Sequence, residues 1–266
     1  MCVLLGQIIM KKSDKLKKLF QQWPMHTVLP VAWLKKKNYS LSLVHAYIAS
    51  NWVVSLGRGI VARPKDKIDW SGFVWGLQRL DAFHVGGKTA LEVQGKAHFI
   101  KFKETNIFLF GQAGLKLPHW MKNVSEISFV KVNTKLLPDD IGIREHNFGE
   151  FSIKISNPAR AFLEYMLLVG KYHTFEEAYY LMENLHFLSS DLMQEVLEKC
   201  TSLKVKRMVL CLAKKQNVHW FKGLDLSKID IGTSVKQIVK NGAYDAQFLI
   251  TYPHSWDRKE EDEVIF

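Results

Sequence analysis

The order of secondary-structure signals in the first quarter of the chain most limits what it can fold into. Apolar residues recur at i, i+3, i+4 and i+7 within residues 16–23, which predicts an amphipathic helix with Ser13 as its cap. Pro24 ends this helix, and Pro30 can open a second, short helix over residues 31–37. The chain therefore begins with two helices that are joined by a short apolar connection.

A third helix is predicted over residues 41–50. Asn38 tolerates the left-handed conformation of a tight turn, and Ser40 is a good N-cap for the helix that follows. Leu41, Val44 and Ile48 are expected to face inward. The outward positions are then Ser42, His45, Ala46 and Ala49.

A β-hairpin is predicted next, because residues 52–56 and 60–63 are mostly apolar and flank Gly57-Arg58-Gly59. Helix, short helix, tight turn, helix and hairpin is the order of a winged helix-turn-helix, whose third helix enters the major groove of DNA. We assign residues 1–67 to such a DNA-binding domain. The alternative is a winged helix that is used for protein contact.

Positive charge is concentrated in the same segment. The chain carries 37 Lys and Arg against 26 Asp and Glu, and residues 1–70 hold 12 of the basic but only three of the acidic residues. This distribution favours a polyanion as partner, with a solvated lysine-rich surface as the alternative. The candidate phosphate contacts are Lys35, Lys36, Lys37, Arg58, Arg63 and Lys65, and the candidate base contacts are Ser40, Ser42 and His45. The third helix has no Arg or Lys for the commonest base-specific contact.

The rest of the chain is predicted to be a larger mixed domain, residues 68–256, followed by an acidic tail, residues 257–266. Asp69 can cap its first helix. Strands are expected at 99–102, 107–110, 127–130 and 151–155, with a late strand at 247–251. Helices are expected after Asn157-Pro158 and after the capping box Thr174 to Glu177. Two more are expected along the apolar stripes of residues 193–200 and 205–212. The side opposite the last stripe carries Lys204, Lys206, Arg207, Lys214 and Lys215. The fold class is therefore α+β, with a small sheet and a C-terminal helical group.

No catalytic or metal site can be assembled from the sequence. The segment from His84 to Thr89 resembles a phosphate-binding loop, but Ala82 stands where that motif needs a glycine, so a turn that opens a helix is the better interpretation. The pairs Asp139-Asp140 and Glu145-His146 lack partners at a recognised spacing. Cys2, Cys200 and Cys211 are too scattered for a zinc site or a disulfide framework. We expect no cofactor, no bound metal and no enzymatic activity.

A cytoplasmic location is expected. No apolar run reaches the ~20 residues that a membrane span needs. The apolar segment at residues 2–10 lacks a preceding positive charge and a cleavage site, so it is not interpreted as a signal peptide.

An ordered series of short stretches between Leu16 and Pro253 resembles the AbiEi antitoxins of type IV toxin–antitoxin systems, which are also transcriptional regulators. The stretches are Ser55-Leu56-Gly57-Arg58-Gly59, Asp69-Trp70 with Gly72, Leu77-Gln78, His84 to Glu92 with Gln94-Gly95, Leu109-Phe110-Gly111, Leu117-Pro118 with Trp120, Ile155-Ser156 with Pro158, Arg160 and Ala161, Val205-Lys206-Arg207, Trp220-Phe221, and Leu226 with Ile229-Asp230 and Gly232. The chain departs from the family in having fewer basic residues along the third helix.

The resemblance implies a winged-helix domain that represses the operon of the antitoxin and its toxin, and a C-terminal domain that supplies antitoxicity. The implied partners are double-stranded DNA, as the protein's own operator with inverted repeats, and a nucleotidyltransferase-like toxin that it opposes without needing a stable complex. The associated role is phage defence by abortive infection. Two alternatives are a DNA-directed enzyme such as a nuclease, and an interaction module that binds the toxin directly.

Overall fold

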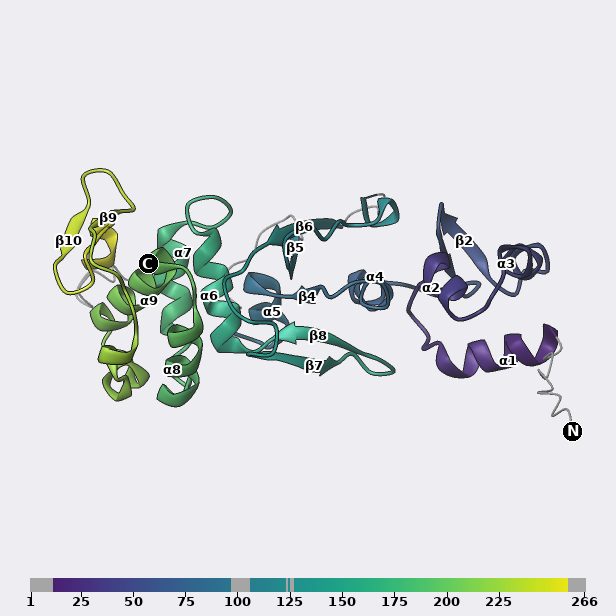
Figure 1. Ribbon diagram of the computed structural model, residues 1–266, viewed down its shortest axis with the longest axis horizontal. Helices are drawn as coiled ribbons and strands as arrows, with labels where there is room; N and C mark the ends of the chain where they lie inside the picture. Colours follow the sequence, from purple (N-terminus) through teal and green to yellow (C-terminus); the bar gives the residue numbers. More distant parts are fainter. Residues whose placement is uncertain (1–11, 97–105, 123, 125–126, 258–266) are drawn as a thin grey trace, which may run out of the picture. The chain divides into compact units, whose positions relative to one another are not determined.

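The computed structural model describes residues 12–96, 106–122, 124 and 127–257 (Figure 1). It has a mixed α+β architecture, as the sequence predicts. Its contacts divide the chain into two compact units. Unit 1 comprises residues 1–82, 116–125 and 146–153, and unit 2 comprises residues 83–115, 126–145 and 154–266. The domain boundary expected near residue 67 stays a prediction.

Unit 1 contains the expected order of elements: helix, short helix, helix and hairpin. The helices are α1 (Lys12–Gln22), α2 (Val31–Lys36) and α3 (Leu41–Ala49). An antiparallel sheet places β3 (Ile60–Ala62) between β1 (Leu29–Pro30) and β2 (Val54–Gly57). Ser13 lies inside α1 instead of capping it.

The start of α3 follows the predicted turn and cap. Asn38 adopts a φ of 63°, and Ser40 Oγ accepts a hydrogen bond from Leu43 N at 3.2 Å. The inward face, however, consists of Leu43, Val44 and Tyr47. The expectation that Leu41 faces inward is wrong, because this first helical residue lies on the opposite side and is 42% exposed.

Another helix of unit 1, α4 (Trp70–Leu77), is capped as predicted: Asp69 Oδ1 accepts hydrogen bonds from Ser71 N and Gly72 N. A Cβ on Gly72 would lie 2.0 Å from the carbonyl oxygen of His26. The missing side chain therefore lets α4 pack directly on the backbone that precedes β1.

A five-stranded sheet has the order β6-β5-β4-β8-β7. Its strands are β4 (His84–Val85), β5 (Asn106–Gly111), β6 (Ser128–Asn133), β7 (Ile143–Asn147) and β8 (Ser152–Ser156). Residues 146–153, which include the end of β7 and the beginning of β8, group with unit 1. Three of the expected strands are thus present, and the one at residues 99–102 lies outside the described residues. The sequence does not predict β4, which has two residues, or β7, which is mostly polar.

Helices make up most of the rest of unit 2. They are α5 (Gly87–Val93), α6 (Pro158–Leu168), α7 (Phe175–Glu183), α8 (Ser190–Lys199) and α9 (Leu203–Lys215). Short 3₁₀ helices lie at His119–Lys122 in unit 1 and at His219–Gly223, Leu226–Lys228 and His254–Asp257 in unit 2. A third, small sheet has the order β10 (Ala243–Asp245), β11 (Ile250–Tyr252) and β9 (Lys236–Gln237).

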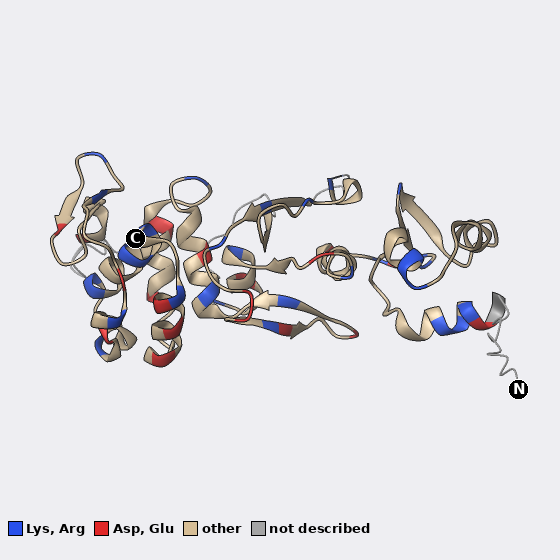
Figure 2. Cartoon of the chain, viewed as in Figure 1, with Lys and Arg blue, Asp and Glu red and all other residues tan. Residues whose placement is uncertain are grey.

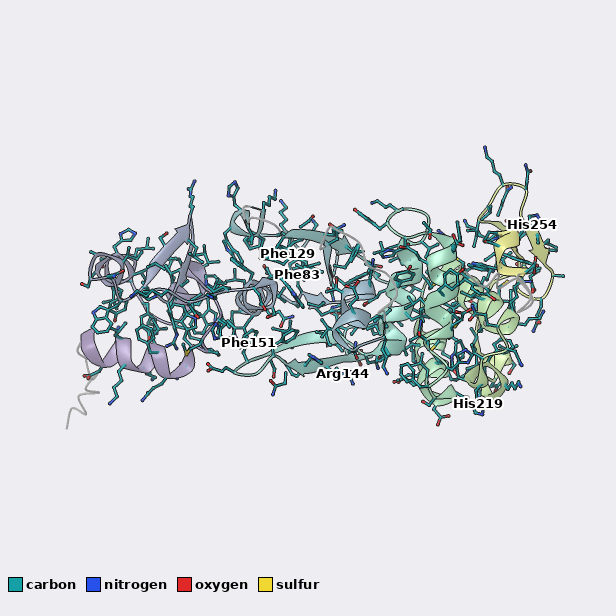
Figure 3. All side chains as sticks on the ribbon, turned by 180° about the vertical axis from the view of Figure 1, so that it is seen from behind. Phe83, Phe129, Arg144, Phe151, His219 and His254 are labelled. Carbon is teal, nitrogen blue, oxygen red and sulfur yellow. The ribbon has the colours of Figure 1, made fainter. Side chains whose placement is uncertain are left out.

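The predicted caps of α6 and α7 are present. Asn157 accepts from Arg160 N, and Thr174 and Glu177 form a reciprocal capping box. Apolar side chains of β5 and α6 are buried together, including Phe108, Phe110 and Leu168. Phe83, labelled in Figure 3, is 1% exposed and fits against Gly111, whose added Cβ would lie 3.0 Å from the Phe83 ring.

Two of the basic residues that are predicted opposite the apolar stripe of α9, Lys206 and Arg207, are buried. Lys206 Nζ donates to the Asp230 carbonyl at 3.0 Å. Arg207 donates to the carbonyls of Ile231, Ser234 and Leu249. The chain after α9 returns over this side of the helix, and helical periodicity alone does not reveal that cover.

His173 is the centre of an aromatic cluster in unit 2. Its ring stacks on Tyr165 at a centroid distance of 4.1 Å and meets Phe108 edge-on at 5.2 Å. Burial, together with the positive charge of Lys88, lowers the pKa of His173 to about 4. The imidazole is therefore neutral in the folded protein at neutral pH.

We expect this histidine to make the fold acid-sensitive. Because its pKa is depressed on folding, the unfolded chain binds more protons between pH 6.5 and 4, so stability falls as the pH drops through this window. Between pH 7 and pH 5, His173→Phe should reduce the loss of unfolding free energy by about 2 kcal/mol. Urea unfolding of both proteins at the two pH values measures the difference. Equal losses would contradict the assignment.

Candidate nucleic-acid interface

The outward face of α3 is the first part of the candidate interface. Successive helical residues are about 100° apart, which places Leu41, Ser42, His45 and Ala49 on one side, opposite the buried residues. All four are exposed. The hydroxyls of Ser40 and Ser42 lie 2.9 Å apart, so they are oriented by each other at the beginning of the helix.

Basic side chains flank this helix. Lys35, Lys36 and Lys37 are exposed where α2 ends, and Figure 2 shows this segment in blue together with part of α1. The ammonium of Lys37 lies 5.7 Å from the centre of the Trp33 ring, which holds it near the surface of α2. The turn from α2 to α3 thus begins with three adjacent positive charges.

The tip of the β2-β3 hairpin carries Arg58. Gly57 and Gly59 adopt φ values of 129° and 88°, which side chains rarely tolerate, and Arg58 stands exposed between them. The Gly59 carbonyl accepts a hydrogen bond from Val31 N at 2.9 Å, which attaches the hairpin to the start of α2. Lys65, also exposed, follows β3.

Arg63 differs from the other predicted phosphate contacts. Its guanidinium lies over the rings of Phe20 and Trp23, at 4.7 and 5.5 Å, and donates to the carbonyl oxygens of both residues. Burial lowers the pKa of Arg63, although the nearby carboxylates of Asp66 and Glu150 partly oppose this. The side chain therefore ties the end of α1 to the end of β3.

The electrostatics of this surface favour an anion. Residues 15–65 contain nine Lys and Arg and no Asp or Glu. Within the described part of the chain, Lys35, Lys36, Lys37, Arg58 and Lys65 form no ion pair. Exposed cations without internal counterions are free to contact phosphates, and such contacts release the counterions that are condensed on the nucleic acid.

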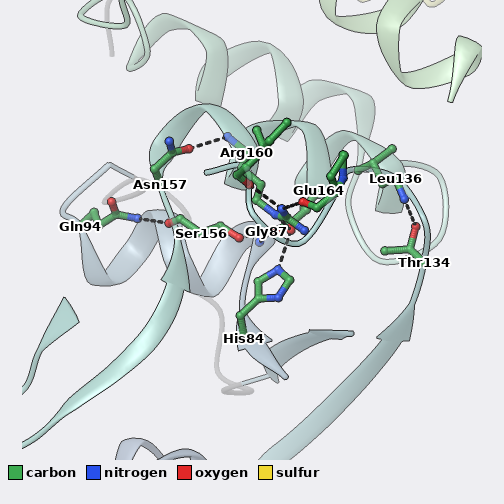
Figure 4. Close-up of polar contacts among 11 residues, drawn as sticks. His84, Gly87, Gln94, Thr134, Leu136, Ser156, Asn157, Arg160 and Glu164 are labelled. Carbon is green, nitrogen blue, oxygen red and sulfur yellow. Dashed lines mark hydrogen bonds and ion pairs between the residues drawn. The ribbon is translucent and has the colours of Figure 1, made fainter. Parts of the chain in front are cut away.

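The segment from His84 to Thr89 belongs to unit 2 and receives an anion from the chain itself. Figure 4 shows that the carboxylate of Glu164, on α6, lies at the start of α5. It accepts from Gly87 N at 3.1 Å and pairs with His84 Nε2 at 2.8 Å. A Cβ on Gly86 would lie 2.1 Å from Glu164 Oε2. The phosphate-loop appearance thus comes from glycines that admit an internal carboxylate.

Two further donors complete the environment of Glu164. Arg160 Nε donates at 2.8 Å and Ser156 Oγ at 2.7 Å. Burial alone would raise the pKa of Glu164, but the charges and hydrogen bonds of His84 and Arg160 outweigh it and hold the pKa below its ordinary value. The carboxylate is ionised and fully engaged.

The carboxylates and cysteines that the sequence offers for catalytic or metal chemistry do not come together in one site among the described residues. Asp139 accepts a hydrogen bond from Gln112, and both Asp139 and Asp140 are exposed. Burial raises the pKa of the Cys200 thiol, and that of Cys211 to about 12. Among residues 12–96, 106–122, 124 and 127–257, no group of three or more His, Cys, Asp or Glu side chains is placed to hold a metal ion.

The fold resembles a solved structure. The crystal structure of the RV2827C protein from Mycobacterium tuberculosis superposes with a TM-score of 0.55 over 90% of this chain and 89% of that chain, at 12% sequence identity. This likeness concerns the fold alone. No match is found among curated proteins. None of the described helices is long and apolar enough to cross a membrane.

Two family models cover almost all of the chain. The model of the AbiEi antitoxin N-terminal domain, a transcriptional regulator, matches residues 12–102. The model described as transcriptional regulator, AbiEi antitoxin, type IV toxin–antitoxin system matches residues 104–253. The chain therefore belongs to the AbiEi family of antitoxins and transcriptional regulators.

Removal of the Glu164 charge should destabilise unit 2. Glu164→Gln leaves the buried Arg160 without its counterion, so we expect a loss of about 3–5 kcal/mol in unfolding free energy at pH 7. Because the pKa of Glu164 is lowered on folding, the difference should shrink as the pH falls below about 4. Urea unfolding measures it.

Glu92→Gln is the matched control, since Glu92 forms only a 3.9 Å pair with Lys88 and its side chain is 41% exposed. It should change the stability by no more than about 0.5 kcal/mol. Equal effects of the two substitutions would contradict the role given to Glu164.

Proposed function

We propose that the protein is a DNA-binding transcriptional autorepressor and a non-enzymatic antitoxin of a type IV toxin–antitoxin system. The observation that carries the DNA-binding part is the exposed face of α3, flanked by cations in a segment of 51 residues, 15–65, that has no acidic residue. Membership of a family of transcriptional regulators supports the same conclusion.

In this proposal, residues 1–67 act as a winged helix-turn-helix. Helix α3 enters the major groove, with Ser40, Ser42 and His45 toward base edges. Phosphates are contacted by Lys35, Lys36, Lys37, Arg58 and Lys65. Arg63 is left out of this set because its guanidinium is bound inside unit 1.

The remaining assignments follow the family. Residues 68–256 would supply antitoxicity and residues 257–266 an acidic tail. The partners would be the protein's own operator and a nucleotidyltransferase-like toxin that it opposes without a stable complex. The protein would act in the cytoplasm, without a cofactor, in phage defence.

The direct test is a gel shift of the purified protein on its own upstream region at ~150 mM salt, with unrelated DNA as competitor. A shift that survives the competitor supports autorepression. A shift that the competitor abolishes would contradict it.

Arg58→Ala should weaken DNA binding at the hairpin tip. Loss of one phosphate contact lowers the slope of log affinity against log salt by about one and leaves sequence preference unchanged. A salt titration by fluorescence anisotropy measures the slope. Arg63→Met and Lys222→Ala are controls that should leave the slope unchanged. The Arg63 guanidinium is bound inside unit 1, and Lys222 lies in unit 2. An unchanged slope for Arg58→Ala would contradict its role.

DNA binding and antitoxicity should be separable by substitutions in the full-length chain. Replacing Lys35, Lys36 and Lys37 together by Gln removes three phosphate contacts, which lowers affinity by roughly 10-fold or more at physiological salt. Coexpressed with the toxin of its operon, this variant should still restore growth, since antitoxicity is proposed to need only the later part of the chain. Glu164→Gln should show the opposite pattern: it should keep DNA binding and fail to restore growth. Loss of both activities in the lysine variant would contradict the separation.

A further inference from the structure

The exposed face of α3 contains a large apolar residue at its beginning. Leu41 is the first residue of the helix and is 42% exposed, although burial would stabilise such a side chain. Its neighbours on the same face include Ala49, one further apolar position, and His45 between them. The outward stripe of the helix is therefore apolar at both ends.

This stripe lacks the side chains that bind guanine. Bidentate contacts to guanine need Arg or Lys, and those to adenine need Asn or Gln, but the exposed positions Leu41, Ser42, His45 and Ala49 include none of these. The base-edge feature that an apolar side chain recognises in the major groove is the C5-methyl group of thymine.

We infer that α3 reads thymine methyl groups, with Leu41 as the main specificity-determining residue and Ala49 as a second contact. This inference rests on the proposed DNA-binding function. It specifies that the protein selects A·T pairs at the positions that Leu41 and Ala49 contact. Residues in the first turn of a recognition helix reach deepest into the groove, and Leu41 occupies that position.

The surroundings of Leu41 favour DNA over an apolar protein partner. Lys35, Lys36 and Lys37 are exposed and precede it by four to six residues, and no acidic residue lies between residues 15 and 65. The hydroxyls of Ser40 and Ser42 flank it and can donate to thymine O4 or accept from the adenine amino group. An apolar side chain between two serine hydroxyls, on a helix that follows three exposed cations, matches a base edge between phosphates.

The test begins with selection of bound duplexes from a random library by the full-length protein. In the selected duplex, each thymine is then replaced in turn by uracil, which removes only the methyl group. At one or two positions, affinity should fall about fourfold, the equivalent of one buried methyl group. Leu41→Ala should weaken binding to the thymine duplex and abolish the difference between thymine and uracil at one of these positions.

Leu41→Met keeps an apolar side chain of similar size and should retain the difference. Leu203→Ala is the matched control, because Leu203 is the first residue of α9 and is 38% exposed. Equal affinity for thymine and uracil at every position, or a difference that persists at all of these positions in Leu41→Ala, would overturn the inference and leave the DNA-binding proposal intact. Failure to enrich any duplex would instead overturn the DNA-binding proposal itself.

Discussion

One buried carboxylate holds the centre of unit 2 together. Glu164 on α6 accepts hydrogen bonds from the start of α5 and from Ser156 at the end of β8, and it pairs with His84 on β4 and Arg160 on its own helix. An ionised group without water costs several kcal/mol unless every lone pair is used. The network therefore fixes how two helices and two strands meet, and a shift of any one of them removes a hydrogen-bond partner from a buried polar group.

This interaction also explains why the segment from His84 to Thr89 looks like a ligand-binding loop. Phosphate loops use glycines so that backbone N–H groups can approach an anion closely. Here Gly86 and Gly87 serve the same physical requirement, but the anion is a side chain 77 residues further along the chain. Spacing within a short motif can indicate that an anion is bound. It does not reveal whether the anion comes from a ligand or from the fold.

The sequence predicts those features whose hydrogen bonds close within three or four residues. Ser40, Asp69, Asn157 and Thr174 cap their helices as expected, because each side chain meets a nearby backbone N–H. Features that depend on distant chain segments are missed. The burial of Lys206 and Arg207 depends on the carbonyls of residues 230–249, and β4 is too short to give a pattern. In the candidate interface, Lys35, Lys36 and Lys37 are exposed. The position of the Arg63 guanidinium depends on aromatic rings 40 or more residues earlier in the chain, and the exposure of Leu41 depends on which face of α3 is buried.

Arginine shows why net charge alone does not define the interface. Arg63, Arg160 and Arg207 donate to carbonyl or carboxylate oxygens inside their units, so their charges serve the fold. Arg58 and the lysines of residues 35–37 are exposed. Cations at this surface would supply affinity that weakens with salt, because they act on phosphates. The outward face of α3 carries no Lys, Arg, Asp or Glu, so its discrimination between bases would come from methyl contacts and hydrogen bonds, which salt screens little. Affinity and sequence preference would thus arise from different residues of one small unit, and each could change without the other.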